Sequence, residues 1–252
     1  MELWKTNFMS SKIAVVTGAG GGIGSAITAR LIEDNFHVVS LDINGENLKK
    51  LESNFSTNVT TFIVDLTSAE KIAEVFKSIK AKFGGVDALI NNAGDCFMSE
   101  FPNIPAQEFD KQMAVNFSSA FYCSQESVKL MLERPGIKKI VNISSNGAYN
   151  FDVFDPPHYR ASKAAMDTLT KDLARRYAKE GICVNSIAPA MTESPLFKVL
   201  SDEVLKKAIS QMPRGAAMKP DEIAAWVGFL ISSAGDVSSG NVIILNQGRD
   251  VR

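Results

Sequence analysis

The fold is decided by Ile13-Ala-Val-Val-Thr-Gly-Ala-Gly-Gly-Gly-Ile-Gly24, in which a short apolar run ends in a turn dense in glycine. A helical pattern follows, from Gly22 to about Asp34. A strand, a glycine turn and a helix in this order form the context of a dinucleotide-binding fingerprint. The glycines allow a tight turn and let backbone N–H groups approach a pyrophosphate at the helix N-terminus. A plain turn between a strand and a helix can use the same glycines, so this pattern alone leaves both interpretations open.

An acidic residue further along the chain favours the nucleotide-binding interpretation. Asp42 ends the next apolar run, which begins at Phe36. It follows Gly24 at close to the ~20-residue offset at which a carboxylate meets the adenosine ribose in this fingerprint. We therefore expect Asp42 at the ribose end of a nucleotide site.

The composition excludes several classes of function. The chain has 252 residues, of which 45% are hydrophobic, and its 27 basic and 28 acidic residues give a net charge of −1. The two signs are mixed along the chain, so we expect no nucleic-acid partner. No apolar run approaches the ~18 residues of a membrane span, and the start of the chain does not resemble a secretory signal. We therefore expect no membrane partner, a cytoplasmic location, and a single domain over residues 1–252.

Cysteine and histidine are scarce. Cys96, Cys123 and Cys183 are widely spaced, which is typical of thiols in a reducing compartment, and small core residues are the simplest interpretation of all three. His37 and His158 are the only two histidines, so we expect no metal site.

Apolar runs alternate with longer helical patterns along the whole chain. Continuous runs of valine, isoleucine and leucine are typical of parallel strands that helices cover on both faces. The sequence therefore predicts an α/β fold with a single Rossmann-type doubly wound parallel sheet of about seven strands and helices on both faces. The predicted strands are 12–17, 36–42, 59–64, 86–91, 138–144, 181–187 and 241–246, and the predicted helices are 22–34, 44–54, 67–83, 105–133, 157–180, 195–211 and 220–233.

Ligands of such a sheet bind at the carboxyl ends of its strands, so the loops there carry the candidate site. After the third predicted strand come Asp65 and Leu66, and Asp65 can accept from an adenine amino group or help to cap the helix that starts near Thr67. After the fourth, Asn91-Asn92-Ala93-Gly94 can approach a flat ligand or simply form a turn. Asn116 lies inside a predicted helix, where asparagine is unfavourable, and a structural and a functional role are equally open.

A tyrosine and a lysine share one face of the predicted helix 157–180, because Tyr159 and Lys163 are four residues apart. A free tyrosine has a pKa of ~10, but a nearby ammonium and a bound nicotinamide cation favour the phenolate. Such a tyrosine can exchange a proton while a hydride moves. An exposed amphipathic pair would show the same spacing. Ser144 and Ser145 follow the fifth predicted strand, where they can form a turn or contact a ligand.

With these residues in hand, the sequence resembles the short-chain dehydrogenase/reductase family, from about Lys12 to Gly248. The motifs appear in the family's order. They are a coenzyme turn at Thr17-Gly18-x-x-x-Gly22-Ile23-Gly24, adenine-side and sheet-stabilising motifs at Asp65-Leu66 and Asn91-Asn92-Ala93-Gly94, and a catalytic tetrad at Asn116, Ser145, Tyr159 and Lys163.

The resemblance implies a role for each member of the tetrad. Tyr159 is expected to be the general acid/base, while Lys163 holds the nicotinamide ribose and lowers the tyrosine pKa. Ser145 is expected to hydrogen-bond the substrate oxygen, and Asn116 to position a water. The reaction implied is an NAD(P)-dependent interconversion of a secondary alcohol and a ketone, in which the cofactor supplies the hydride chemistry.

Two departures from the family's pattern concern backbone and spacing. Ser145 precedes Tyr159 by 14 residues, one more than is usual in the family, so Ser144 is an alternative for its role. The family's Pro-Gly after the sixth strand is Pro189-Ala190, which would strain Ala190 if the position needs a positive φ.

Further differences concern the cofactor. Ser194 takes the place of the family's threonine that contacts the nicotinamide carboxamide, and Gln247-Gly248 replaces a late Gly-Gly. The carboxylate of Asp42 would repel a 2′-phosphate, and the glycine turn holds no cation. We therefore expect NAD as the cofactor, with NADP less favoured.

The substrate loop is expected at about residues 190–214. It holds Met191, Pro195, Leu196 and Phe197, and an apolar pocket or ordinary core packing can use these together with Phe97, Met98, Phe151 and Phe154. We expect a small-molecule alcohol or ketone as the substrate. An apolar one, such as a 3-oxoacyl or steroid-like carbonyl, is slightly favoured, and a polyol or a cyclic diol remains open. The resemblance implies a homodimer or homotetramer. The alternative function is a dinucleotide-binding regulator or scaffold with weak or no turnover.

Overall fold

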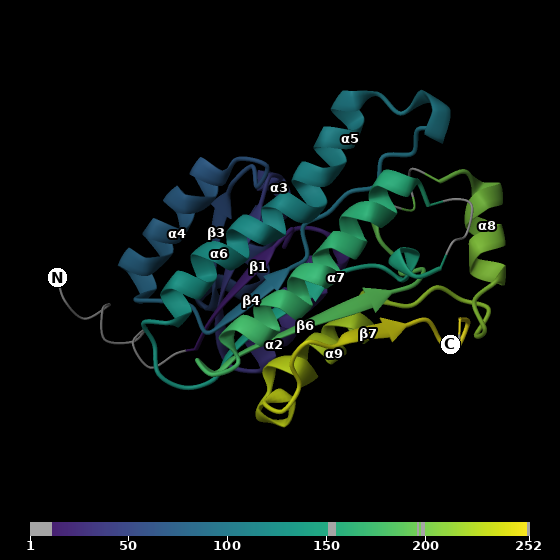
Figure 1. Ribbon diagram of the computed structural model, residues 1–252. Coiled ribbons are helices and arrows are strands. Elements are labelled where there is room, and N and C mark those ends of the chain that lie inside the picture. The colour runs from purple at the N-terminus through teal and green to yellow at the C-terminus, as the bar shows by residue number, and fades with distance from the viewer. Residues whose placement is uncertain (1–11, 151–154, 196, 198–199, 251–252) are drawn as a thin grey trace.

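The computed structural model describes residues 12–150, 155–195, 197 and 200–250. Within them, seven parallel strands form one sheet in the order β3-β2-β1-β4-β5-β6-β7 (Figure 1). The strands are β1 (Lys12–Thr17), β2 (Phe36–Asp42), β3 (Val59–Ile63), β4 (Ala88–Asn91), β5 (Lys138–Ile143), β6 (Ile182–Pro189) and β7 (Val242–Leu245). The predicted doubly wound α/β fold is confirmed.

Helices cover both faces of the sheet. They are α2 (Gly22–Glu33), α3 (Gly45–Phe55), α4 (Ala69–Phe83), α5 (Ala106–Met113), α6 (Ser119–Met131), α7 (Pro157–Tyr177), α8 (Asp202–Ser210) and α9 (Pro220–Ile231). Short 3₁₀ turns lie at η1 (Ser56–Asn58), η2 (Phe101–Asn103), η4 (Asn146–Ala148) and η6 (Ser233–Gly235), and η3 (Ala114–Ser118) is a π-helical turn. None of the described helices is long and apolar enough to cross a membrane.

Alternate residues of β1 pack into two hydrophobic cores, one on each face of the sheet. In β1, Ala14 and Val16 pack with α2, α3 and α9, while Ile13 and Val15 pack with α4, α6 and α7. Because both faces of the strand are buried, both sets of positions must be apolar, and the sequence shows an unbroken apolar run.

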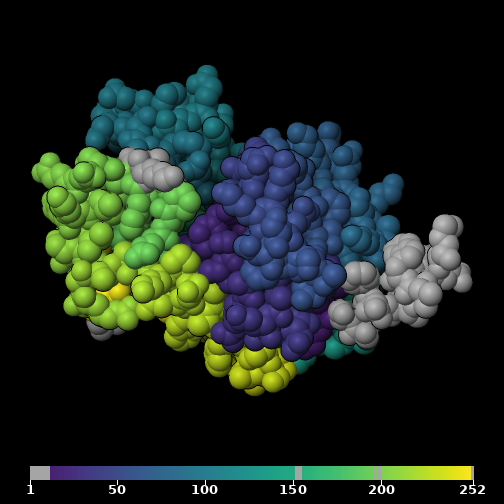
Figure 2. Space-filling view, turned by 180° about the vertical axis from the view of Figure 1, so that it is seen from behind, coloured from purple at the N-terminus to yellow at the C-terminus, as the bar shows by residue number. Residues whose placement is uncertain are grey.

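The strand order places a topological switch beside β1. This strand pairs with β2 on one side and with β4 on the other. The loops that leave β1 and β4 therefore diverge to opposite faces, and a crevice opens at their carboxyl ends. In Figure 2 the surface is hollowed between the green segment that contains α8 and the purple N-terminal half.

Two predicted helices differ from the observed ones, apart from small shifts at the ends of other elements. The predicted helix 105–133 is interrupted by the π-helical turn η3 between α5 and α6. The predicted helix 195–211 is helical only from Asp202, because the Ser201 hydroxyl accepts from the N–H of Val204 and starts the helix there. Of the described residues before it, Ser194, Phe197 and Leu200 line the cavity described below.

Candidate active site

The glycine turn between β1 and α2 is shaped by missing side chains. Gly18 has a φ of 62°, in the left-handed region that favours glycine. A Cβ on Gly24 would lie 2.1 Å from the Gly18 carbonyl oxygen, so the helix can start this close to the turn only with glycine there. Gly21 is the N-cap of α2, and no side chain caps the first N–H groups of the helix. These groups and the helix dipole can receive an anion.

The turn is fastened to the neighbouring strand β4 by side chains. The buried Thr17 hydroxyl accepts from the N–H groups of Asn92 and Ala93, at 3.0 Å each. In return, the Asn92 amide donates to the carbonyl oxygens of Thr17 and Gly18 at 3.1 and 3.0 Å. These bonds hold the ends of β1 and β4 in one fixed arrangement.

Asp42 lies at the end of β2, next to the glycine turn. Its Oδ2 accepts from the N–H of Gly20 and its Oδ1 from that of Asn44, both at 2.8 Å. A Cβ on Gly20 would come within 3.1 Å of the same carboxylate. An anion-binding helix start, a close glycine turn and an adjacent carboxylate fit the pyrophosphate and ribose of a dinucleotide.

Asp65 and Leu66 lie after β3. Asp65 Oδ1 accepts from the backbone N–H and the hydroxyl of Thr67, at 3.0 and 2.7 Å, and these bonds lower the Asp65 pKa. Helix α4 is capped by Ser68 instead, whose hydroxyl accepts from the N–H of Lys71. The predicted capping role of Asp65 is therefore wrong. Leu66 is buried in the core that contains α4.

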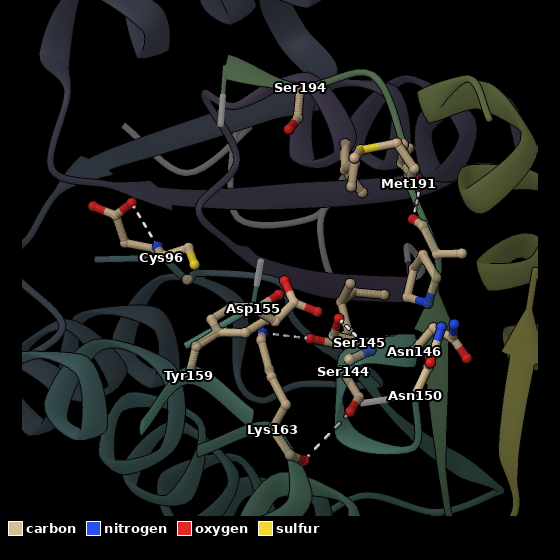
Figure 3. Close-up of a pocket in the computed structure, with 18 of the residues that line it drawn as sticks. Cys96, Ser144, Ser145, Asn146, Asn150, Asp155, Tyr159, Lys163, Met191 and Ser194 are labelled. Atoms are coloured by element: carbon tan, nitrogen blue, oxygen red, sulfur yellow. Dashed lines mark hydrogen bonds between the residues drawn. The ribbon is translucent and has the colours of Figure 1, made fainter. Parts of the chain in front are cut away.

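A cavity lies at the carboxyl ends of β4, β5 and β6 (Figure 3). Of the predicted site residues, it is lined by Ile23, Asn92, Gly94, Ser145, Tyr159, Lys163, Pro189 and Ser194. The other predicted site residues, which are not part of its wall, are Thr17, Gly18, Gly22, Gly24, Asp42, Asp65, Leu66, Ala93 and Asn116. The cavity thus gathers the residues predicted for the reacting end.

The predicted apolar side chains reach the cavity only in part. Met98, Met191 and Phe197 line it, whereas Phe97 does not. Phe151, Phe154 and Leu196 lie outside the described residues. The remaining wall is mixed, with apolar residues such as Ile143 and Leu200 beside polar ones such as Asn146 and Asn150.

Tyr159 and Ser145 meet at the cavity wall. Tyr159 lies in the first turn of α7, which starts at Pro157. Ser145 is close enough to the tyrosine hydroxyl to lower the Tyr159 pKa. The Ser145 oxygen also accepts from the N–H of Gly147 at 3.0 Å, which fixes the serine side chain. Figure 3 shows both side chains on the same side of the cavity as Lys163.

The expected lowering of the Tyr159 pKa by Lys163 is not found. Burial is the first cause that raises the pKa of Tyr159 and the charge of Asp155 is the second, while Ser145 acts against them. Lys163 Nζ lies 6.0 Å from the centre of the tyrosine ring and donates to the Ile143 carbonyl oxygen at 2.9 Å. Burial also lowers the pKa of Lys163 to about 8.

The two serines have different surroundings. Ser144 is buried, and its hydroxyl donates to Asp167 at 2.9 Å and to the Lys163 carbonyl oxygen at 3.3 Å. Ser145, in contrast, acts on the hydroxyl of Tyr159. The wall of the cavity includes both, but the hydroxyl of Ser145 is the one next to the phenol.

Asn116 lies in the π-helical turn η3 and is fully buried. Its amide donates to the Ser162 hydroxyl at 3.0 Å, and its Oδ1 accepts from the N–H of Asp95 at 2.8 Å. A Cβ on Gly94 would lie 3.2 Å from both Asn116 Oδ1 and Lys163 Nζ. Both side chains therefore reach the same point beside Gly94. The π turn accommodates an asparagine that a regular helix disfavours.

The backbone strain considered for Ala190, a positive φ, is not found there and occurs at Gln247 instead. Ala190 is not among the described residues with positive φ, whereas Gln247 has a φ of 60°. The Gln247 side chain accepts from the N–H of Arg214 and donates to the Ala216 carbonyl oxygen, which holds the C-terminal turn against that loop. Ser194 lies opposite the glycine turn, since a Cβ on Gly22 would be 3.8 Å from its Cα.

Two carboxylates near the cavity were missed by the sequence reasoning. Asp167 is buried and accepts from the hydroxyls of Ser144, Tyr149 and Ser186, at 2.9, 2.9 and 2.6 Å. Burial raises its pKa. The signal was present, because Asp167 follows Lys163 at the same spacing of four that joins Lys163 to Tyr159. Asp155 lines the cavity, and burial raises its pKa to about 6.

The cysteines are only partly as expected. Cys123 and Cys183 are buried, but Cys96 is half-buried and lines the cavity, where burial raises its pKa to about 12. In the part of the chain that the structure describes, no group of three or more histidine, cysteine or acidic side chains could hold a metal ion.

Comparisons with known proteins agree with this geometry. The family model for short chain dehydrogenases matches residues 12–205. The chain is 31% identical to a 3-oxoacyl-[acyl-carrier-protein] reductase of Thermotoga maritima, over 95% of this chain and 98% of that protein. It is 31% identical to a 3alpha-hydroxysteroid dehydrogenase of Mediterraneibacter gnavus, over 93% and 95% of the two chains.

Two further relatives extend the comparison. An acetoacetyl-CoA reductase of an Acinetobacter species is 32% identical, over 94% of this chain and 97% of the relative. The crystal structure of gox2181 superposes with a TM-score of 0.90 at 26% identity, over 99% of both chains. The chain therefore belongs to the short-chain dehydrogenase family, whose members are oxidoreductases that act on a CH–OH group or its carbonyl and use a nicotinamide dinucleotide.

Proposed function

We propose that the protein interconverts a secondary alcohol and a ketone in the cavity, with Tyr159 as the general acid/base and NAD as the cofactor. The observation that carries this proposal is that Ser145, Tyr159 and Lys163 line the same cavity, where Ser145 acts on the tyrosine hydroxyl to lower its pKa. A hydroxyl pair of this kind can hold a substrate oxygen and exchange a proton with it.

The residues of the glycine turn would hold the cofactor. The start of α2 would receive the pyrophosphate, Asp42 the adenosine ribose, and Asp65 with Leu66 the adenine side. Ile23, Asn92, Gly94, Pro189 and Ser194 line the part of the cavity assigned to the nicotinamide. When bound, a nicotinamide dinucleotide supplies the hydride acceptor or donor.

The side chains of the cavity handle the proton. In the oxidation of an alcohol, Tyr159 takes the hydroxyl proton as hydride leaves the carbinol carbon, and Ser145 keeps the oxygen in place. In the reduction, Tyr159 returns the proton to the new alkoxide. The positive charge of an oxidised nicotinamide ring opposes the effects that raise the pKa of Tyr159.

Lys163 and Asn116 are proposed to complete a proton path. They approach the same point beside Gly94 without a direct hydrogen bond between them. A bridging water is the ordinary link between polar groups at such a separation. Lys163, with its pKa lowered to about 8, can exchange protons near neutral pH.

The preference for NAD over NADP rests on Asp42. Its carboxylate already accepts two backbone N–H groups at the end of β2. A 2′-phosphate on the adenosine ribose would bring a second negative charge to this position. The glycine turn itself contributes no basic side chain.

The assembly and the location are also inferences. Phe109 and Phe121 expose 47% and 39% of their surface on α5 and α6, and Trp226 and Phe229 are similarly exposed on α9. Aromatic side chains grouped on helices favour self-association, and we infer a homodimer or homotetramer. The cytoplasmic location remains a prediction.

The test is a panel of secondary alcohols incubated with NAD or NADP while the absorbance of the reduced cofactor is followed. We expect turnover by the wild-type protein and a loss of about 10²–10⁴-fold in Tyr159→Phe, because the phenylalanine cannot accept the proton. The affinity for NAD should change little, which a binding titration checks. Near-normal turnover in Tyr159→Phe would remove this residue from the mechanism, and NAD binding without turnover of any alcohol would favour a regulator.

A further inference from the structure

Asp155 brings a negative charge to the wall of the cavity. It lies just before α7, and its backbone carbonyl oxygen accepts from Arg160 at 2.9 Å, which fixes this end of the chain segment. Within the described part of the chain, no hydrogen bond to its carboxylate oxygens is found, although they border the cavity. The carboxylate is therefore open to a donor that enters the cavity.

The carboxylate lies next to the position assigned to the reacting oxygen. A Cβ on Gly147 would lie 2.4 Å from Asp155 Oδ2 and 3.2 Å from Ser145 Oγ. The two oxygens are thus no farther apart than the sum of these distances. Asp155 also acts electrostatically on Tyr159, whose pKa it raises. Figure 3 shows Asp155 beside Tyr159 and Ser145.

This upper limit is compatible with one substrate that reaches both oxygens through groups on neighbouring carbon atoms. If Ser145 and Tyr159 hold the oxygen of the reacting carbon, a group on the adjacent carbon reaches Asp155. An apolar group there would leave a desolvated carboxylate that has the charge of Arg160 near it but no hydrogen-bond donor, which is costly. A hydroxyl or an ammonium would donate a hydrogen bond to it, and a substrate carboxylate or phosphate would be repelled.

A second acceptor at the cavity supports the same conclusion. Asn146 lines the cavity and is 4% exposed. Its amide nitrogen donates to Asp250 at 3.0 Å, but its Oδ1 is buried without a hydrogen-bond partner among the described residues. A buried acceptor of this kind requires a donor, and a substrate with more than one hydroxyl provides it.

We propose that Asp155 selects substrates that carry a hydrogen-bond donor on the carbon next to the reacting carbon, which makes the substrate a vicinal diol or α-hydroxy ketone. This inference rests on the proposed function and replaces the slight preference for a small apolar alcohol. An ammonium in place of the second hydroxyl would satisfy Asp155 by the same chemistry.

The experiment compares three alcohols on each variant: cyclohexanol, trans-cyclohexane-1,2-diol and trans-2-aminocyclohexanol, with saturating NAD. For the wild-type protein, we expect kcat/KM for the diol to exceed that for cyclohexanol by at least about tenfold, because a hydrogen bond to a charged acceptor is strong. In Asp155→Leu this ratio should fall to near one. The ratio is taken within one variant, so a partial loss of folded protein cancels.

A second substitution and a control define the chemistry. Asp155→Asn keeps an acceptor oxygen but removes the charge, so it should retain part of the preference for the diol and lose any preference for the amine. Asp172→Asn removes an exposed carboxylate that pairs with Arg176 on the same helix, and its ratios should match the wild-type values. A higher kcat/KM for the amine than for the diol in the wild-type protein would identify the donor as an ammonium.

The outcomes also separate this inference from the proposed function. Turnover of cyclohexanol by the wild-type protein with no preference for the other two alcohols would overturn the inference and leave the proposed function intact. A preference that persists in Asp155→Leu would do the same. If the protein binds NAD but oxidises neither these three alcohols nor any alcohol of the wider panel, the result would count against the proposed function itself. The inference would then fail as well.

Discussion

The nucleotide side and the substrate side of the crevice treat their polar groups in opposite ways. On the nucleotide side, Thr17, Asp42 and Asn92 each make two or more hydrogen bonds to backbone groups of the turns around them. On the substrate side, burial displaces the pKa values of Asp155, Tyr159 and Lys163. The polar groups of the nucleotide side are held in place by backbone hydrogen bonds. Those of the substrate side are titratable groups whose ionisation would be stabilised by a ligand or changed by a proton.

The nucleotide side therefore determines the shape of the binding site, and the substrate side determines its reactivity. Changes on the nucleotide side should alter stability and cofactor affinity, because they disturb backbone geometry that exists before any ligand binds. Changes on the substrate side should alter rates more than stability, because those side chains act on groups that appear during the reaction. Three substitutions, each with a matched control, test this contrast.

The largest effect is expected at the two serines. Ser145→Ala should lower kcat by about 10²–10³-fold, because it removes a donor to the substrate oxygen. Ser144→Ala should lower kcat much less and instead reduce the free energy of unfolding by about 1–3 kcal/mol, because its hydroxyl donates to the buried Asp167. Steady-state kinetics and urea denaturation of both variants check this, and the reverse pattern would assign the substrate to Ser144.

The glycine turn should show the next largest effect. Gly24→Ala places a Cβ against the Gly18 carbonyl oxygen, and we expect a loss of about 1–3 kcal/mol in the free energy of unfolding together with weaker NAD binding. Gly21→Ala is the control, since its Cβ would meet the same oxygen at 3.5 Å, an ordinary contact. Urea denaturation and an NAD titration measure both. Equal behaviour of the two variants would show that the turn is not a rigid cradle.

The smallest effect is expected for cofactor choice. Asp42→Ala should shift the ratio of kcat/KM for NAD to that for NADP by about tenfold toward NADP, because the repulsion of a 2′-phosphate is lost. Glu46→Ala, which removes an exposed carboxylate paired with Lys49 on α3, should leave the ratio unchanged. If the ratio is unchanged in Asp42→Ala, this carboxylate does not determine the choice between NAD and NADP.

The nucleotide side could be predicted from the sequence because its signals are local. A glycine turn of given spacing, an apolar run on each side and an acid at the end of the second run belong to one continuous segment. The helices and strands of the whole sheet followed from the same kind of periodicity. The largest errors lay at 114–118, where a π turn interrupts a helix, and before Asp202, where the described residues Phe197 and Leu200 line the cavity and do not belong to an α-helix.

The substrate side could be predicted only as a set of positions. Sequence spacing paired Tyr159 with Lys163, but it could not show that the lysine ammonium turns to the Ile143 carbonyl oxygen. It also could not show that Gly147 leaves space for Asp155, because the two residues meet through a tertiary contact. The expected direction of the Tyr159 pKa shift was wrong, because the pKa depends first on burial, which spacing does not show, and then on the charge of Asp155 just before α7.

The π turn at Ala114–Ser118 sets how α6 is rotated about its axis relative to α5. An α-helix turns by about 100° per residue, so one additional residue in a turn rotates everything beyond it by that angle. Asn116 faces inward to Ser162, while Phe121 on α6 is exposed. The additional residue of the π turn therefore decides which side chains of α5 and α6 face the core and which face outward. Deleting one residue there would move the buried Asn116 amide and the exposed Phe121 ring at the same time.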